Sequence, residues 1–338
     1  MQDAASEPTE GRTSAQGSLR AKRPRLAGLI IGAVAFLGLV ALVLHIGDIG
    51  AFADAILRTD PGWLLLAILA QALAFLAQAI VWGLVLSRRR SPIATTDLFV
   101  LSIGKLFADQ AIPSAGVSGA VFFIHALIRR GVAAADAFAA FVFGATSFIL
   151  TFVAFAAGSL VFLAFSGGSL EEFSADLSDI HFVAIALVLL TLVIGAFVIA
   201  TQNRIGGSHS PLVRIRDTVT KAAAVIRKER GLFLTCIALQ AIQRFLDGAT
   251  LWIAFEAQGG GVTFATTVIA VSLGSLAATV APTPMGLGSF EAGLLAALAS
   301  LGHGVETSFA AGLIYRGLSL GLPLALGFIV VQRELLRK

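Results

Sequence analysis

The chain has 338 residues, of which 57% are hydrophobic and 13% charged, and its mean hydropathy is +0.91. This composition excludes a water-soluble domain, because a chain of this length cannot remove so much apolar surface from water without a lipid bilayer. The single cysteine, Cys236, excludes an intrachain disulfide and a cysteine-based metal cluster. No motif typical of a metal site, a nucleotide-binding loop or a hydrolase nucleophile occurs, so we expect no metal, no other cofactor and no nucleic-acid partner.

The first 25 residues (1–25) are polar, contain no aromatic residue and end in a basic run, which predicts a disordered cytoplasmic tail. Six apolar runs follow, each long enough to cross a bilayer as a helix of about 20 residues. The first run is too long for the apolar part of a signal peptide and no small-residue cleavage site follows it, so we expect it to stay in the membrane. The six runs lie at about 26–46, 62–86, 133–165, 181–201, 231–255 and 306–330.

Two further apolar segments, 97–128 and 264–302, are interrupted by proline and glycine. The returning part of the first, 117–128, would rise only about 18 Å as a helix, which does not cross a hydrocarbon core of about 30 Å. We therefore expect two re-entrant helical hairpins whose tips are buried in protein or line a polar cavity; short helix pairs that cross fully are the alternative. The interrupting residues are Pro113, Gly116 and Gly119 in the first segment and Pro282, Pro284, Gly286 and Gly288 in the second.

The charged residues outside the apolar runs separate by sign. With the N-terminus in the cytoplasm, the loops on that side hold Arg88–Arg90, Arg129, Arg130 and the basic run 204–230. The loops on the other side are acidic, and Arg58 is their only basic residue. Because Lys and Arg concentrate in cytoplasmic loops, the sequence predicts a multi-pass protein of the inner (plasma) membrane with both termini in the cytoplasm.

The order of the segments repeats with inverted orientation. Residues 26–166 contain helix, helix, hairpin and helix starting inside, and residues 181–332 contain the same series starting outside. Such an inverted repeat, with interrupted segments at matching positions, predicts a transport site near the midplane, although enzymes and scaffolds also carry repeats. Between the halves, residues 211–230 are amphipathic with a basic polar face, which favours a helix on the anionic leaflet or, alternatively, a solvated linker helix. The predicted fold class is thus an all-α integral membrane protein with about six full spans and two hairpins.

Ionisable residues within the apolar segments are the main candidates for a functional site, since each is costly in a bilayer unless it is paired or hydrated. Lys105 and Asp109 lie four residues apart in the first hairpin. Arg244 and Asp247 lie three apart in the fifth run. Each pair therefore shares a helix face and can neutralise itself, either in a polar cavity or as an internal ion pair that holds helices together. A polar stripe in the fifth run, expected to face the bundle interior, consists of Gln240, Gln243, Arg244 and Asp247.

Arg316 and Glu291 have no partner nearby in the sequence. Arg316 lies on a face of small and polar residues that lets another segment approach closely, and Glu291 begins the returning arm of the second hairpin, where a carboxylate is stabilised by the helix N-terminus. Two interpretations stay open. The residues form a salt bridge with each other, or Arg316 binds a phosphate and Glu291 sets its position, since arginine suits oxyanion recognition.

The second hairpin reads PTPMGLGSFE over 282–291, and the last run reads LIYRGLSLGLP over 313–323. These stretches resemble the lysylphosphatidylglycerol synthetase transmembrane-region family of flippase-like membrane proteins, which has a proline- and glycine-rich turn followed by Glu and, in its final span, a Tyr-Arg pair ahead of a proline. The first turn, PSAGVSG over 113–119, resembles the family's other turn. The resemblance covers about residues 26–335.

The chain departs from the family pattern at four positions. Ala120 and Phe123 stand about where the first turn usually continues with an acidic residue and an arginine, Met285 replaces a glycine, and Phe290 stands where an arginine often precedes the Glu. The family's synthetases carry a soluble aminoacyl-transfer domain after the membrane part. Only about eight residues follow the last expected span here, so the resemblance implies the flippase part alone, without lysyl transfer.

Together these observations predict a lipid translocase that moves an anionic or isoprenoid headgroup through a polar cavity near the midplane. Lys105, Arg244 and Arg316 would offset phosphate charge, and the three carboxylates would orient them. The alternative is a non-transporting accessory subunit that presents membrane lipid to a partner, such as a lipid-synthesis enzyme or glycosyltransferase encoded nearby. An enzymatic role is not expected, because no nucleophile–base pair is visible.

Overall fold

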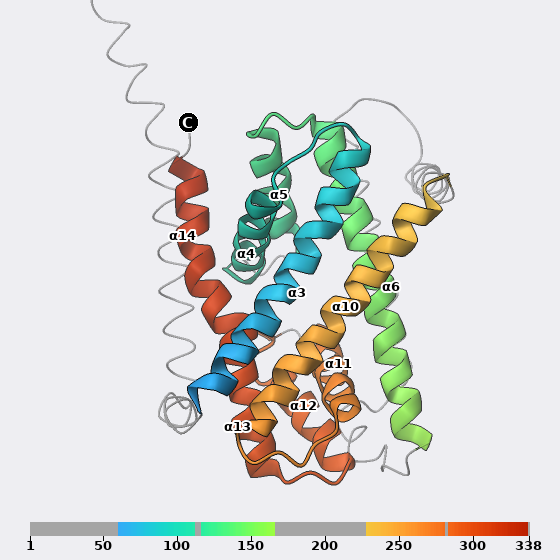
Figure 1. The fold of residues 1–338 in the computed structure, drawn as a ribbon, viewed down its shortest axis with the longest axis vertical. Coiled ribbons are helices and arrows are strands. Elements are labelled where there is room, and N and C mark those ends of the chain that lie inside the picture. The colour runs from blue at the N-terminus through green and yellow to red at the C-terminus, as the bar shows by residue number, and fades with distance from the viewer. Residues whose placement is uncertain (1–59, 112–115, 166–227, 281–282, 337–338) are drawn as a thin grey trace, which may run out of the picture.

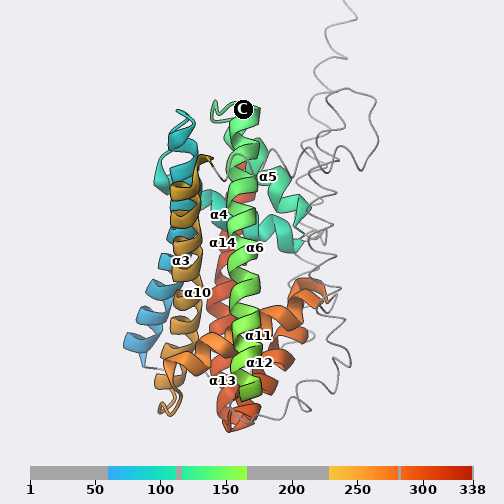
Figure 2. The same cartoon turned by 90° about the vertical axis from the view of Figure 1, so that its right-hand side faces the viewer.

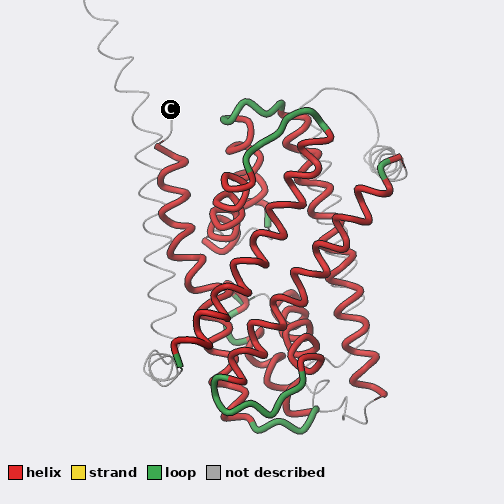
Figure 3. Tube along the Cα trace, in the orientation of Figure 1, coloured by secondary structure: helices red, strands yellow, loops and turns green. Residues whose placement is uncertain are grey.

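The computed structural model describes residues 60–111, 116–165, 228–280 and 283–336. Throughout these residues the regular structure is helical, and no strand occurs among them (Figure 3). Four helical segments are long and apolar enough to cross a membrane, which fits the predicted all-α membrane protein. They coincide with four of the six expected spans. The spans expected at 26–46 and 181–201, the tail 1–25 and nearly all of the amphipathic segment 211–230 lie outside the described residues.

The described helices form two consecutive groups with the same order of long and short helices (Figure 1). In each group a long helix is followed by a hairpin of two shorter helices and then by another long helix. The first group consists of α3 (Pro61–Arg88), α4 (Thr95–Ala111), α5 (Val117–Ile128) and α6 (Ala134–Phe165). The second consists of α10 (Arg230–Glu256), α11 (Phe264–Val280), the short η1 (Pro284–Gly286), α12 (Ser289–Ser300), and a continuous helix made of α13 (Val305–Arg316), the π-helical segment η2 (Gly317–Gly321) and α14 (Leu322–Leu336).

Helix α3 shows how local sequence sets the ends of a span. Asp60 caps its N-terminus by accepting a hydrogen bond of 2.6 Å from the Gly62 N–H, and a proline occupies the first turn, where its missing N–H costs nothing. At the other end the Ser91 N–H bonds to the Leu86 carbonyl and Arg90 has a φ of 58°. This is a left-handed helix end at which glycine is the usual residue.

The hairpins α4–α5 and α11–α12 occupy opposite ends of the bundle, and both point their tips toward its middle (Figures 1 and 2). Glycines with positive φ precede the returning helices: Gly116 at 86° and Gly288 at 81°. The tips approach each other through Met285, which packs in one apolar cluster with Phe107 of α4 and two leucines of the last helix. The described parts of the two interruptions therefore lie where the two halves of the bundle meet.

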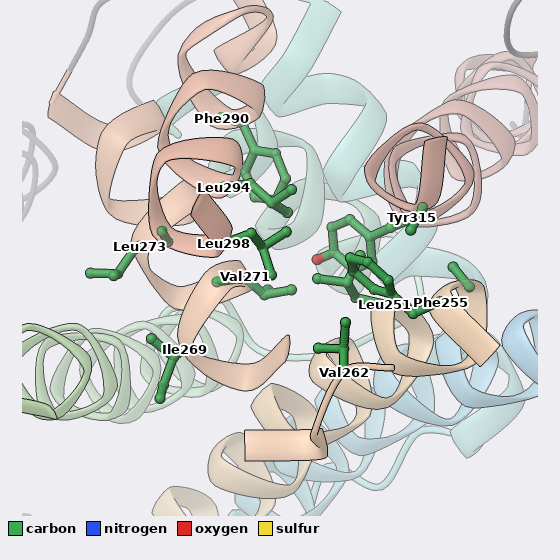
Figure 4. Close-up of a cluster of buried hydrophobic side chains, with 14 of the residues drawn as sticks. Leu251, Phe255, Val262, Ile269, Val271, Leu273, Phe290, Leu294, Leu298 and Tyr315 are labelled. Atoms are coloured by element: carbon green, nitrogen blue, oxygen red, sulfur yellow. The ribbon is translucent and has the colours of Figure 1, made fainter. Parts of the chain in front are cut away.

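Two larger apolar clusters fill the bundle, one for each half. Figure 4 shows the cluster around the second hairpin, where side chains of α10, α11, α12 and α13 converge and the Tyr315 ring enters among leucines. Close backbone contacts allow this packing. A Cβ on Gly293 would lie 2.5 Å from the Cβ of Ala277, and one on Gly327 would lie 2.5 Å from the Cβ of Phe107, so α12 meets α11, and α14 meets α4, at glycine.

The charges at the two ends of the bundle differ. Among the described residues every Lys or Arg outside the middle of the bundle lies at one end, called the basic end below. The opposite end carries Asp60, Glu256 and Glu306 and no described Lys or Arg. The basic loops thus share one end of the bundle, and the assignment of that end to the cytoplasm stays a prediction. The basic-end residues are Arg88–Arg90, Arg129, Arg130, Lys228, Arg230 and Arg333.

Candidate functional site

Arg316 and Glu291 form a direct ion pair near the middle of the bundle. The Arg316 Nε donates to Glu291 Oε1 at 2.8 Å, and the two side chains are 14% and 25% exposed. Arg316 Nη2 also donates to the Met285 carbonyl at 3.1 Å, and the guanidinium carbon lies 4.6 Å from the centre of the Phe290 ring. Of the two interpretations that the sequence leaves open, the salt bridge is therefore formed in this structure.

The tip of the second hairpin is shaped to hold this pair. Glu291 Oε2 accepts the Gly288 N–H at 2.7 Å, which fixes the carboxylate at the start of α12, where the helix N-terminus favours negative charge. Met285 has a φ of 60°, a conformation that L-residues avoid and that turns its carbonyl toward Arg316. The methionine that replaces a family glycine thus keeps a glycine-like backbone.

The helix changes its winding directly after Arg316. Residues Gly317–Gly321 form a π-helical segment, in which the Leu322 N–H bonds to the Gly317 carbonyl five residues earlier. Pro323 follows and has no N–H to continue the regular series. Because π-segments in α-helices frequently mark functional sites, this local irregularity singles out the end of α13 independently of its charge.

The pair Arg244 and Asp247 lies in the interior, as the polar stripe predicted. Arg244 Nη1 is 3.7 Å from Asp247 Oδ2, and the side chains are only 10% and 9% exposed. The guanidinium carbon lies 4.8 Å from the centre of the Phe148 ring and 5.6 Å from that of Phe152, both on α6. Aromatic faces thus take the place of further anions around this arginine.

Two glutamines of α3, which were not predicted from the sequence, complete the stripe. Gln71 Nε2 donates to Asp247 Oδ1 at 3.5 Å, and Gln240 Nε2 donates to Gln78 Oε1 at 3.2 Å. Gln240 Oε1 and Gln243 Oε1 are buried and have no hydrogen-bond partner among the described residues, so within that part of the chain these two side chains keep free acceptor capacity. The signal was present in the sequence, since two glutamines seven residues apart in an apolar run share a helix face.

Lys105 and Asp109 pair within the first hairpin at 2.6 Å. Asp109 Oδ1 also accepts the Gly119 N–H at 2.8 Å, so a carboxylate from the outgoing arm reaches the start of the returning arm. A Cβ on Gly119 would lie 2.2 Å from that oxygen, which explains the glycine. Asp109 therefore supplies negative charge at a turn where Ala120 replaces the family's acidic residue.

The three pairs are not all joined. Tyr315 stacks on Phe290 with ring centres 5.7 Å apart and packs in one apolar cluster with Leu251 of α10, so it links the second hairpin to the helix that carries the polar stripe. Among the described residues no hydrogen bond or ion pair connects Lys105 and its partner to the other two pairs. The predicted site thus divides into a linked group on α10, α12 and α13 and a separate pair on α4.

The remaining predicted positions are structural turns. Gly116, Gly286 and Gly288 all adopt positive φ, and Gly286 also packs where a Cβ would lie 2.8 Å from that of Ala278. Pro284 begins η1, whereas Pro113 and Pro282 lie outside the described residues. In the described part of the chain no group of three or more His, Cys, Asp or Glu residues is arranged to hold a metal ion.

Comparison with known proteins places this arrangement in a family. No curated protein matches the chain. The family model for the lysylphosphatidylglycerol synthase TM region matches residues 26–327, a range that contains both hairpins, the α10 stripe and Arg316. The chain therefore belongs to the lysylphosphatidylglycerol synthase TM-region family.

Proposed function

We propose that the protein is a lipid translocase, not an enzyme, and that it moves a phosphate-bearing headgroup past the paired charges where the two hairpins meet. The observation that carries this proposal is the arrangement of Arg316. Its guanidinium is fixed by Glu291 and the Met285 carbonyl, both of which belong to the interrupted hairpin. Arginine in a membrane interior is costly, and here it is held beside irregular backbone, which a membrane protein tolerates only where it is buried in protein or lines a polar cavity.

The geometry leaves part of Arg316 free for a ligand. Nε and Nη2 are engaged, whereas Nη1 donates to no described residue, and 14% of the side chain is exposed. A lipid phosphate that approaches Nη1 can take over part of the negative charge that Glu291 supplies to Arg316. Glu291 keeps its hydrogen bond from the Gly288 N–H meanwhile. Because Glu291 keeps this hydrogen bond, releasing the arginine costs less than it would for a carboxylate with no other donor, which favours exchange between the protein anion and a lipid anion.

We further propose that the two groups of helices form an inverted repeat around this site. Their helix lengths support it: α3 and α10 have 28 and 27 residues, α4 and α11 both have 17, and α5 and α12 both have 12. The hairpins enter from opposite ends of the bundle (Figure 1). Transporters with inverted repeats bind substrate near the midplane, between interrupted helices.

Side-chain contacts support the same relation. Gln71 and Gln240 are each the eleventh residue of their long helix, and Gln78 and Asp247 are each the eighteenth. A twofold relation between α3 and α10 therefore turns the contact from Gln71 to Asp247 into the contact from Gln240 to Gln78. In both contacts an amide nitrogen of the eleventh residue donates to an oxygen of the eighteenth.

Reconstituted vesicles test the proposal. Protein is inserted into vesicles that contain a trace of phosphatidylglycerol with a fluorescent headgroup-proximal label, and a membrane-impermeant reductant reports how much label reaches the outer leaflet. We expect faster loss of protected label than in empty vesicles. Arg316→Lys keeps the charge but not the planar fork, so it should slow movement about tenfold while remaining folded, whereas the control Arg333→Gln, an exposed residue at the basic end, should match the parent.

Two results would contradict translocation. Parental rates in Arg316→Lys and Arg316→Ala proteins that are both folded would remove the arginine from the pathway. Retention of labelled lipid by the purified protein, without any movement in vesicles, would instead assign the protein to the accessory role, in which lipid is presented to a lipid-synthesis partner.

A further inference from the structure

A second feature of the bundle has the chemistry of a lipid-binding site. A pocket of about 390 Å³ lies at the basic end, between the end of α3 and the beginnings of α6 and α10. Apolar side chains line its inner part: Val85 and Phe143, which are core residues, and Leu232. Charged side chains form the rest of the lining. The pocket is thus amphipathic, with apolar walls toward the bundle and charge toward its end.

The charges of the lining favour an anion. Four cationic residues, Arg88, Arg89, Arg90 and Lys228, stand against two acidic ones. One acidic residue, Asp136, is already engaged, since it accepts from Arg89 at 3.4 Å and from the Ser91 hydroxyl at 3.0 Å.

Glu229 is the second acidic residue of the lining. No described residue forms an ion pair with Arg88, Arg90 or Lys228, so the excess positive charge at this pocket is not compensated within the described part of the chain.

The backbone conformation of Arg90 also supports a ligand site at this pocket. Its φ of 58° is a left-handed conformation, and glycine is the residue that adopts it without strain at the end of a helix. Arg129 and Gly131 show the contrast at the next turn, where the positive φ of 84° falls on a glycine and the arginine remains in regular geometry. Residues that keep a strained backbone conformation cluster at ligand sites. Here the strained residue is an arginine that lines the pocket.

The N-termini of two helices add to the positive electrostatic potential at the pocket. Helix α6 begins at Ala134 and α10 at Arg230, and residues of the first turn of α6 and of the segment that leads into α10 line the pocket. The positive ends of both helices therefore lie beside it, which favours a negatively charged group. Asp136 is the only acidic residue of the described lining that lies in the first turn of α6.

We propose that this pocket binds the phosphate group of an anionic membrane lipid, with the phosphate against Arg88 and Arg90 and the glycerol and first acyl carbons against Val85 and Phe143. A free phosphate ester would share the first contact and lack the second. The site is distinct from the Arg316 group, and lipid can occupy it whether or not the protein moves lipid, so it stands or fails independently of translocation.

The test measures binding of fluorescent phosphatidylglycerol to the full chain in detergent. Arg90→Gly removes the charge and suits the left-handed backbone, so the variant should be at least as heat-stable as the parent and yet bind about tenfold more weakly, the effect of one lost charged hydrogen bond. Arg88→Gln should weaken binding similarly. Arg333→Gln, which removes an exposed charge from the same end outside the pocket, should change binding less than twofold.

The controls separate this pocket from general surface charge and from free phosphate. Parental affinity in Arg90→Gly, or an equal loss in Arg333→Gln, would overturn the proposal. Labelled phosphatidylcholine, whose headgroup has no net charge, should bind more weakly, and equal affinity would remove the electrostatic basis. Soluble glycerol phosphate should compete only at large excess; competition at concentrations equal to the lipid would assign the pocket to a free phosphate ester and overturn the lipid assignment.

Discussion

The Arg316 and Glu291 pair should be energetically coupled. Each single substitution leaves the other charge buried and unpaired, so the losses of the two single variants should sum to more than the loss of the double variant. A buried pair that loses one partner costs about 3–5 kcal/mol, and because these side chains are 14% and 25% exposed we expect about 3 kcal/mol for Glu291→Gln. Arg316→Leu should cost about 1 kcal/mol more, since it also removes the cation–π contact with Phe290. In the double variant neither charge is left unpaired, so the two losses should overlap by about 2 kcal/mol.

The measurement is the free energy of unfolding in mixed micelles, titrated with a denaturing detergent, for the parent, both single variants and the double variant. Arg89→Gln is the matched control, because its ion pair with Asp136 is longer, at 3.4 Å, and its side chain is 37% exposed, which limits its contribution to about 1 kcal/mol or less. Single variants within about 0.5 kcal/mol of the parent, or strictly additive losses, would refute the view that the pair is energetically coupled.

Two further predictions use the same titration. Gly119→Ala should destabilise the protein by about 2 kcal/mol through overpacking, because its Cβ would lie 2.2 Å from Asp109 Oδ1; Gly158→Ala, on α6 with no atom within 4 Å of the added carbon, should be neutral or slightly stabilising, and an equal loss in both would contradict the steric argument. Arg130→Gln should cost about 3 kcal/mol, because Arg130 holds Glu334 through bonds of 2.8 and 2.6 Å with both side chains about nine-tenths buried; a loss below 1 kcal/mol would contradict it.

Local chemistry made much of the fold predictable. Four expected spans match helices because about 20 apolar residues must cross the bilayer as one regular element. The hairpins were visible as prolines and glycines inside apolar segments, and the expected returning arm 117–128 is helix α5. The pairs at Lys105 and Arg244 were predictable for the same reason, since three- and four-residue spacing fixes a shared helix face.

Contacts across long stretches of sequence were not predictable in this way. Arg130 and Glu334 are 204 residues apart, and nothing in either local sequence selects the other among several possible partners. The pair Arg316 and Glu291, 25 residues apart, was one of two open interpretations. The left-handed Met285 also escaped prediction, because the local sequence favours glycine there and only the surrounding packing holds a methionine in that conformation.

The π-helical segment has a mechanical consequence for the first hairpin. If Gly317–Gly321 were rewound as α-helix, one residue would leave the wide turn, and α14 would rotate by about 100° and shift by about 1.5 Å relative to α13. Gly327 would then leave its place against α4, where a Cβ would lie 2.5 Å from Phe107 and 2.8 Å from the Ile103 carbonyl. A neighbouring residue with a side chain would take that place, so α4 would have to move away. The helical winding after Arg316 is therefore coupled to the distance between α14 and α4, a helix of the first hairpin, through the contact at Gly327.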